Sequence, residues 1–249
     1  MTSLFTPEKT LKFKRLSSTN YHLRKILAQT ELDEGVMITT LYQTSGRGQY
    51  GNSWHSVEGK NLLLSFLLRP TFLKPSQIFL VNMSVCLALL HTVKPFHRDF
   101  TIKWPNDILW RSLKVAGILI ENSFSGNCIE TTVIGVGVNV NQTDFAPSLK
   151  AGSLKAITGK EHSIESLRLS FANNMEHYYF LLQRNPHLLK QEYLHHLYGF
   201  RQMVPVKCNG VLQQGAITAV HENGQIEMNL NQRENSTFHF KEIEFYRGS

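Results

Sequence analysis

The spacing of apolar residues along the chain predicts four helices. Ser and Thr residues followed by an apolar stripe at three- and four-residue spacing predict a first helix that begins close to Ser18. The apolar run over residues 76–93 predicts a mostly buried helix. Residues 163–184 are apolar at every third or fourth position, which indicates an amphipathic helix, and a further helix is expected over residues 186–198.

Short runs of β-branched and other apolar residues predict strands between these helices. The predicted strands are residues 36–42, 61–68, 100–103, 108–110, 114–121 and 129–139. Residues 45–60 hold four glycines and almost no aliphatic side chain, so a long, mobile loop is expected there. Together these elements predict an α+β fold in which helices pack on a mixed β-sheet.

The pattern changes after about residue 200. Short strand-like segments follow one another, separated by Asn209-Gly210 and Asn223-Gly224, pairs that favour tight hairpin turns. We therefore expect two domains, a larger one over residues 1–199 and a small all-β domain over residues 200–249.

Composition indicates a folded, soluble, cytoplasmic protein. Hydrophobic residues make up 42% of the chain and charged residues only 18%, which argues against disorder. Three cysteines without metal-ligand spacing support neither a disulfide framework nor a zinc site. The net charge of +7 indicates an anionic partner, and residues 59–98 contain no Asp or Glu, so this segment is expected to contact it.

The glycine-rich loop contains the sequence GRGQYG over residues 46–51. It satisfies the G-x-G-x-x-G pattern of dinucleotide-binding proteins, but no helix opens behind it and no acid follows about twenty residues later, so that interpretation is disfavoured. Arg47, flanked by two glycines, instead suggests a nest for an anion, while a plain surface loop is the alternative. Trp54 at the end of the loop is either a core anchor or a platform for a nucleobase.

Four further motifs then occur in order: QTSGRGQYGNSW (residues 43–54), KWPNDI (103–108), KVAGILIE (114–121) and GVGVN (135–139). With Ser18-Thr19-Asn20 they resemble the motif set of the biotin-protein ligases over most of residues 17–141. The resemblance implies a class II synthetase-like catalytic domain and an SH3-like C-terminal barrel. It also implies a short form without the N-terminal DNA-binding domain of some relatives.

The resemblance further implies the reaction and its partners. Such an enzyme uses ATP, with Mg²⁺, to activate biotin as biotinyl-5′-AMP and then passes biotin to a lysine of a biotin carboxyl carrier domain of a carboxylase. Biotin and ATP are substrates, and no tightly bound prosthetic group, resident metal, DNA or membrane partner is expected. A monomer or a homodimer remains open.

The resemblance assigns roles to individual residues. The expected catalytic cations are Arg47 and Lys114. The expected biotin-binding residues are Ser18, Thr19, Asn20, Gln43, Gly46, Arg47, Gly48, Lys114, Gly117, Gly135 and Gly137. The expected nucleotide-binding residues are Arg47, Gln49, Trp54, Lys103, Asn106, Asp107 and Asn139, with Asp107 assisting Mg²⁺. Many members carry more basic residues where this chain has Gln49, Tyr50 and Asn52, which implies weaker retention of the adenylate.

Three alternatives stand beside this interpretation. A lipoate-protein ligase or octanoyl transferase resembles the same fold, but would need a pocket for a long acyl chain. A nucleic-acid-binding module would need aromatic side chains interleaved with basic ones, whereas the C-terminal part is charge-neutral. The pair His195-His196 suggests a metal site, but adjacent helical residues face different ways, which favours a surface pair.

Overall fold

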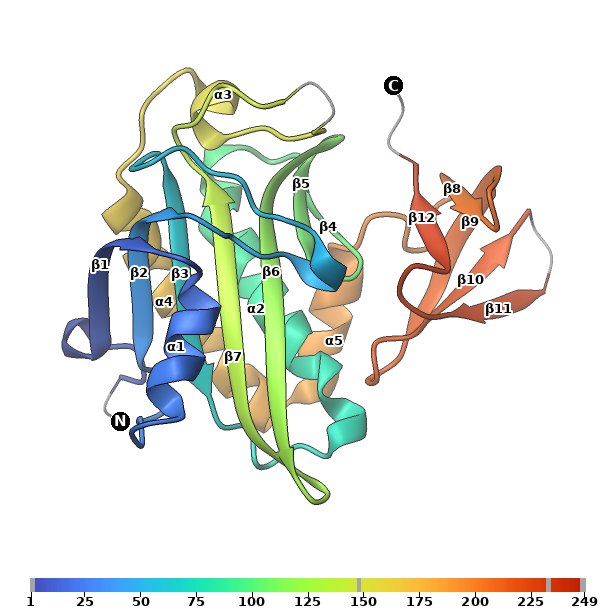
Figure 1. Cartoon of the computed structure of the whole chain (residues 1–249). Helices are drawn as coiled ribbons and strands as arrows, with labels where there is room; N and C mark the ends of the chain where they lie inside the picture. Colours follow the sequence, from blue (N-terminus) through green and yellow to red (C-terminus); the bar gives the residue numbers. More distant parts are fainter. Residues whose placement is uncertain (1–2, 147–148, 232–233, 247–249) are drawn as a thin grey trace.

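The computed structural model describes residues 3–146, 149–231 and 234–246, and a seven-stranded sheet organises the first part of them (Figure 1). The strands are β1 (Thr10–Leu16), β2 (Met37–Gln43), β3 (Asn61–Leu68), β4 (Phe100–Lys103), β5 (Asp107–Trp110), β6 (Leu113–Ser125) and β7 (Cys128–Asn139). Their order is β1-β2-β3-β7-β6-β5-β4. β1 and β2 run parallel and the other neighbours antiparallel, so the predicted mixed sheet is confirmed.

Helices cover both faces of this sheet. They are α1 (Thr19–Leu27), α2 (Phe79–Val93), α3 (Leu154–Thr158), α4 (Ile164–Arg184) and α5 (Pro186–His195). α2, α4 and α5 lie behind the sheet, whereas α1 and the glycine-rich loop lie in front of it (Figure 1). The stretch Pro75–Phe96 is long and apolar enough to span a membrane, but 78% of its 18-residue apolar window is buried within the fold.

The C-terminal part forms a second antiparallel sheet. Its strands are β8 (Val204–Cys208), β9 (Val211–Val220), β10 (Ile226–Leu230), β11 (Asn235–Phe238) and β12 (Ile243–Phe245). The order β11-β10-β9-β8-β12 leaves β11 and β12 at opposite edges, so among the described residues the sheet is open. The expected closed barrel is therefore wrong, although the sheet is consistent with an SH3-like domain. Edge strands of four and three residues offer little length for a closing ladder.

Two elements of the main body, β1 and α3, were not predicted from the sequence. β1 is an edge strand in which only Leu16 is buried, and its short alternation of apolar and charged residues, Leu11-Lys12-Phe13-Lys14, was an available signal that the prediction did not use. α3 is a single turn of helix, capped by the Ser153 hydroxyl, which accepts from the amide of Ala156 at 3.1 Å. Gly159 ends it with φ +73°, a conformation that favours glycine.

The acid-free segment 59–98 does not form the expected contact surface. All of β3 and nearly all of α2 are buried, because the apolar residues that separate the charges in sequence form the core. Lys60 and Arg69 flank the two ends of β3, about 30 Å apart because nine residue steps along a strand separate them. The basic charges of this segment are therefore scattered around the fold, and this expectation is corrected.

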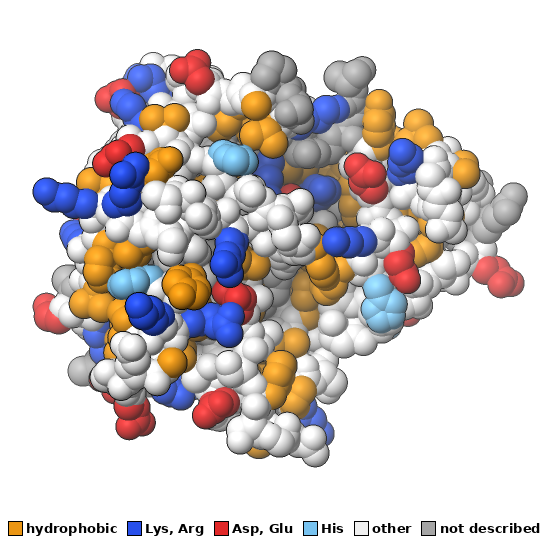
Figure 2. Space-filling view, in the orientation of Figure 1, with side chains coloured by type: hydrophobic (Ala, Val, Ile, Leu, Met, Phe, Trp, Pro, Cys, Tyr) orange, Lys and Arg blue, Asp and Glu red, His pale blue; other side chains and the backbone are white. Residues whose placement is uncertain are grey.

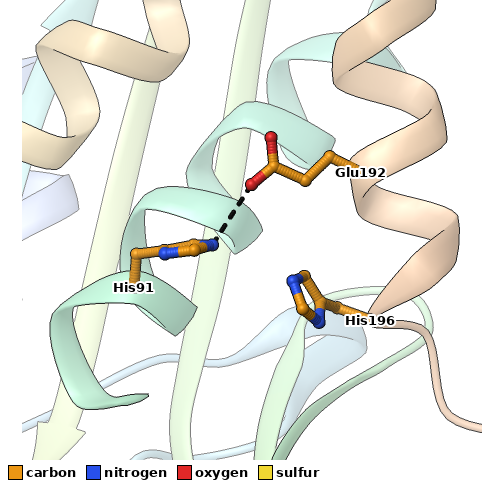
Figure 3. A group of neighbouring side chains, drawn as sticks. All are labelled: His91, Glu192 and His196. Atoms are coloured by element: carbon orange, nitrogen blue, oxygen red, sulfur yellow. Dashed lines mark ion pairs between the residues drawn. The ribbon is translucent and has the colours of Figure 1, made fainter. Parts of the chain in front are cut away.

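A cluster of histidines joins α2 to α5 (Figure 3). His91 of α2 lies with its Nε2 3.2 Å from Oε1 of Glu192, and the hydroxyl of Tyr178 donates to the same oxygen at 2.6 Å. His196 completes a trio whose ligand atoms lie within 4.8 Å of one another. Nζ of Lys94, however, is only 3.5 Å from Nε2 of His196, so an ammonium already supplies positive charge there. We assign the cluster to helix packing.

We predict that this cluster makes stability depend on pH. Burial, with the charge of Lys94 and the neighbouring His195 and His91, lowers the pKa of His196 to about 4. Between pH 6.5 and 4 the unfolded chain therefore binds a proton that the folded chain does not, and the free energy of unfolding falls as pH falls. Denaturant unfolding at pH 7.5 and 5 should show a smaller pH effect in His196→Gln than in the parent.

The matched control is His187→Gln, because His187 is an exposed histidine of the same helix that does not contribute to the lowered pKa of His196. It should keep the parental pH dependence. An equal loss of pH dependence in both variants, or in neither, would contradict the assignment.

Candidate active site

Three glycines on two neighbouring strands form the floor of a cavity of about 430 Å³. Gly117 of β6 lies opposite Gly137 of β7, and Gly135 follows two residues away on the same face. A Cβ at Gly137 would lie 2.6 Å from the indole of Trp54, and one at Gly135 would collide with Asn20. The three glycines therefore leave room above strands that are otherwise core.

The cavity collects nearly all of the predicted site residues. Its lining includes Ser18, Thr19, Asn20, Gln43, Arg47, Gly48, Gln49, Trp54, Lys103, Asn106, Asp107, Lys114, Gly117, Gly135 and Gly137. They come from the start of α1, the end of β2, the glycine-rich loop and strands β4 to β7. Segments distant in sequence thus converge on one hollow, which Figure 2 shows on the face between the main body and the C-terminal part.

Gly46 and Asn139 are not among the lining residues. The carbonyl of Gly46 accepts from the amide of Trp54 at 2.9 Å, and a Cβ there would strike the Trp54 carbonyl, so Gly46 closes the base of the loop. The side-chain amide of Asn139 is buried and donates to the carbonyl of Gly152 at 3.0 Å. It also lies 3.5 Å from the carbonyl of Lys114, so Asn139 fixes the strand that carries this lysine.

A network of uncharged polar groups fills the end of the cavity at α1. Oε1 of Gln43 accepts from the amide of Thr19 at 2.8 Å. The hydroxyl of Ser65 donates to Oδ1 of Asn20 at 2.5 Å and lies 2.7 Å from the hydroxyl of Thr19. Nδ2 of Asn20 donates to Glu121 at 2.9 Å, which fixes the orientation of the amide. Ser65 was not among the predicted residues, although a lone hydroxyl in the apolar run NLLLSFLL was an available signal.

Two lysines and one carboxylate lie at the other end of the cavity. Nζ of Lys114 is 2.5 Å from Oδ1 of Asp107, and Nζ of Lys103 is 3.9 Å from Oδ2. The Asp107 side chain is only 14% exposed, so the pairs are poorly screened by solvent. Register explains the arrangement, because Lys103 and Asp107 are partners across the β4–β5 hairpin and β6 pairs with β5. The cluster carries one net positive charge.

The glycine-rich loop crosses the front of the cavity and bonds mainly to itself. Arg47 and Ser53 form a short antiparallel bridge, and the amide of Gly48 donates to the carbonyl of Asn52 at 2.7 Å. Arg47 is exposed, with its guanidinium 5.8 Å from the ring centre of Tyr21. The indole of Trp54 lies over the glycine floor, and Nζ of Lys114 is 5.6 Å from its centre.

The C-terminal part supplies one wall that the sequence did not indicate. The lining residues from it are Phe240, Lys241, Ile243, Glu244 and Phe245. Phe240 stacks on Trp104 with ring centres 4.9 Å apart and planes at 23°. Trp104, which was not among the predicted site residues, therefore lines the cavity and anchors this wall. No motif marks these residues, since the contact joins segments more than a hundred residues apart.

The family model for biotin/lipoate A/B protein ligases matches residues 12–139, and the chain belongs to this family. Over 141 residues it is 36% identical to the bifunctional ligase/repressor BirA of Bacillus spizizenii, covering 54% of this chain and 43% of the relative. Over 147 residues it is 32% identical to the biotin--[acetyl-CoA-carboxylase] ligase of Paracoccus denitrificans, covering 58% and 60%. The chain thus spans about half the length of these curated relatives.

A solved structure shares the fold over nearly the whole chain. It is the biotin protein ligase from Aquifex aeolicus in complex with biotin and ATP, with a TM-score of 0.78 and 22% identity. The alignment covers 96% of this chain and 99% of that one. The shared fold includes the C-terminal sheet as well as the part that the family model matches.

We predict that Asp107→Asn leaves the two lysines without their shared anion. The free energy of unfolding should fall by about 1–3 kcal/mol, because half-buried ammonium groups lose a charged hydrogen-bond acceptor. Pyrophosphate should restore part of this loss, since it supplies negative charge at the same place, and should stabilise the variant more than the parent. Thermal unfolding with and without pyrophosphate measures both effects.

The control is Glu244→Gln, which removes the other carboxylate among the described lining residues and is exposed. Its response to pyrophosphate should match that of the parent. If pyrophosphate stabilised Asp107→Asn no more than this control, the cluster would not be an anion site.

Proposed function

We propose that the chain is an ATP-dependent biotin-protein ligase that forms biotinyl-5′-AMP and transfers biotin to a lysine of a biotin carboxyl carrier domain. The observation that carries the proposal is the division of one cavity into two ends of different chemistry. One end offers uncharged donors and acceptors, and the other offers two lysines around Asp107. A molecule with a neutral polar head and a terminal carboxylate fits both ends.

The uncharged end favours biotin over lipoate or octanoate as substrate. The ureido head of biotin is rigid, neutral and both donor and acceptor, so it needs matched polar groups of the kind that Ser18, Thr19 and Gln43 bring to the cavity lining. A dithiolane or an alkyl end could form no hydrogen bonds with these groups and would gain nothing from a polar lining. This argument separates biotin from the other substrates that the family name allows.

The charged end suits the first chemical step. An oxygen of the biotin carboxylate attacks the α-phosphorus of ATP, the bond to the β-phosphate oxygen breaks, and pyrophosphate leaves. Both reactants are anions, so positive charge held near the α-phosphate lowers the barrier. Lys114 is the cation closest to the floor, and we assign it to the carboxylate and α-phosphate, with Arg47 and the loop amides on the phosphates.

The remaining nucleotide contacts are assigned by position. Trp54, Gln49 and Asn106 border the space beside the charged cluster, and we place the adenosine there. Mg²⁺ enters as part of the ATP complex. Asp107 already holds Lys114 at 2.5 Å, so binding Mg²⁺ would require it to exchange the ammonium for the metal.

The second step needs no nucleophile from the enzyme. The amine of the carrier lysine attacks the acyl carbon of the adenylate, an amide bond forms, and AMP leaves with the bonding electron pair. The loop across the cavity excludes water, which would hydrolyse the mixed anhydride. We propose a catalytic domain over residues 1–199 that performs both steps and a C-terminal domain over residues 200–249 that completes the cavity wall.

We also propose that the protein works in the cytoplasm without a DNA or membrane partner. Its three cysteines are free thiols, and burial raises the pKa of Cys86, which keeps that thiol uncharged. The stretch long enough to span a membrane is a core helix instead. These observations support a reducing, aqueous compartment.

The test is exchange of labelled pyrophosphate into ATP, which requires reversible adenylate formation. It should depend on biotin and fail with lipoate or octanoate. Lys114→Ala should lower the exchange rate about 100- to 1000-fold, because its charge matters most in the transition state. Lys114→Arg should also be impaired, since a planar guanidinium does not replace a compact ammonium.

Lys207→Ala, a surface lysine of the C-terminal sheet, serves as the matched control and should exchange at the parental rate. If lipoate rather than biotin supported pyrophosphate exchange, biotin would not be the substrate and the enzyme would activate lipoate instead. Exchange that persisted in Lys114→Ala would remove Lys114 from the catalytic role.

A further inference from the structure

The tip of the glycine-rich loop is fastened to the C-terminal sheet by one side chain. Tyr50 projects from the loop with its ring centre 6.1 Å from that of Phe240. Nζ of Lys241 lies 4.5 Å from the centre of the Tyr50 ring, within the range of a cation–π interaction. Tyr50 is therefore held between an aromatic face and an ammonium that belong to a different part of the molecule.

The backbone on both sides of this contact is specialised. Tyr50 has φ 55° and ψ 37°, a left-handed conformation that turns the loop tip outward. Lys241 has φ 72°, in a turn where the amide of Glu242 donates to the carbonyl of His239 at 3.2 Å. The two side chains meet because both turns adopt a conformation that is uncommon for residues other than glycine.

The C-terminal side of the contact is anchored to the main body. Phe240 stacks on Trp104, whose Nε1 donates to the carbonyl of Gly224 at 3.0 Å. The amide of Phe79 at the start of α2 donates to the carbonyl of Glu222 at 3.0 Å. The wall that receives Tyr50 is thus fixed to the helix and hairpin that also shape the cavity.

The two ends of the loop are tied to the main body, but its tip is not. The amide of Ser45 donates to the carbonyl of Ser17 at 2.9 Å and the amide of Val57 to Oε1 of Gln142 at 3.0 Å, whereas the backbone bonds at Gly46 and Gly48 join the loop to itself. Arg47 is the only Lys or Arg in residues 43–59, so Lys241 brings a second cation to the loop from outside. Both Tyr50 and Lys241 line the cavity, so the contact lies directly at its mouth.

We propose that Tyr50, Phe240 and Lys241 form a latch that holds the glycine-rich loop closed, so that the C-terminal domain sets how long the acyl-adenylate stays bound. This inference rests on the proposed function for the identity of the retained molecule. Lys241 acts here as a positioning residue, through the ring of Tyr50. Opening the latch exposes the mixed anhydride to water and to bystander amines.

The experiment follows the lifetime of the bound intermediate. The full chain is loaded with biotin and Mg-ATP, freed of small molecules by rapid gel filtration, and the loss of bound adenylate is timed. Lys241→Met and Tyr50→Ala should each shorten the half-life about two- to fivefold, the range expected for an exposed cation–π contact. The rate of adenylate formation, measured by pyrophosphate exchange, should fall by a smaller factor than the half-life, because the latch acts after the adenylate has formed.

Conservative variants and a matched control isolate the latch. Tyr50→Phe keeps the ring and Lys241→Arg keeps the cation, so both should retain the adenylate as the parent does. Arg201→Met is the control, because Arg201 also has a positive φ of 54° and lies over an aromatic ring, Phe200 at 5.2 Å, on the C-terminal side. It does not line the cavity and should have no effect.

The double variant Tyr50→Ala with Lys241→Met decides whether the two residues act through each other. A latch predicts a half-life no shorter than that of the worse single variant. If the two effects multiplied, Lys241 would act on the ligand directly and the latch would be wrong. Unchanged half-lives in both single variants would overturn it as well.

Amide hydrogen exchange tests the latch without any ligand, so its result does not depend on the proposed function. In the ligand-free chain, Lys241→Met should speed exchange at the amides of residues 47–53, because an unfastened loop opens more often. If the parent formed no adenylate, the proposed function would be overturned. Amide exchange in the ligand-free chain would still show whether Lys241 holds the loop. Exchange that did not differ between parent and variant would overturn the latch.

Discussion

The site depends on one constraint, which is that two neighbouring strands in the middle of a sheet must carry no side chains over a short stretch of one face. Gly117, Gly135 and Gly137 meet it, and they are placed side by side by the register of β6 and β7. On the opposite face the same strands are covered by helices, so the sheet remains rigid although part of it is bare. A hollow with a rigid floor allows polar groups at its edges to keep fixed positions.

The residues around the hollow follow from this floor. At one end, Asn20 lies over Gly135 and is oriented by Glu121 and Ser65, so an uncharged hydrogen-bonding slot forms. Over the other two glycines lies the indole of Trp54, which borders Lys114. The charged cluster and the uncharged slot are thus two ends of one cavity, and the proposed function rests on this arrangement.

Much of this arrangement could be predicted from the sequence because local signals specified it. Helix caps, apolar runs and hairpin glycines predicted most of the helices and strands, and the ordered motifs predicted most of the residues that line the cavity. What could not be predicted depends on long-range packing. Phe240 and Lys241 belong to no sequence motif. They reach the cavity only because the C-terminal sheet docks on the main body, through the carbonyls of Gly224 and Glu222.

The predictions that the structure corrected also failed because they depend on how distant parts of the chain pack. The segment without acidic residues looked like a surface in sequence, but its apolar residues are the core and separate its charges by the length of a strand. The C-terminal sheet was expected to close, yet β12 is too short to offer a second edge to β11. β1 is an edge strand that buries only Leu16, so its apolar residues alternate with charged ones over just four positions, which is too short a signal to stand out.

The most direct test of the account is biotin binding to Gly135→Ala, measured by isothermal titration calorimetry. A methyl group at Gly135 would occupy the position of Asn20 and displace the slot, while leaving every charged group in place. Gly152→Ala is the control, because its methyl group would meet Leu113 at 3.2–3.3 Å, a milder contact than at Gly135 and outside the cavity lining.

We expect Gly135→Ala to bind biotin at least about tenfold more weakly, the effect of losing one buried hydrogen-bonding partner, while the control binds as the parent does. Unchanged affinity for biotin in Gly135→Ala, with the fold intact by circular dichroism, would contradict the claim that the glycine floor forms the binding site.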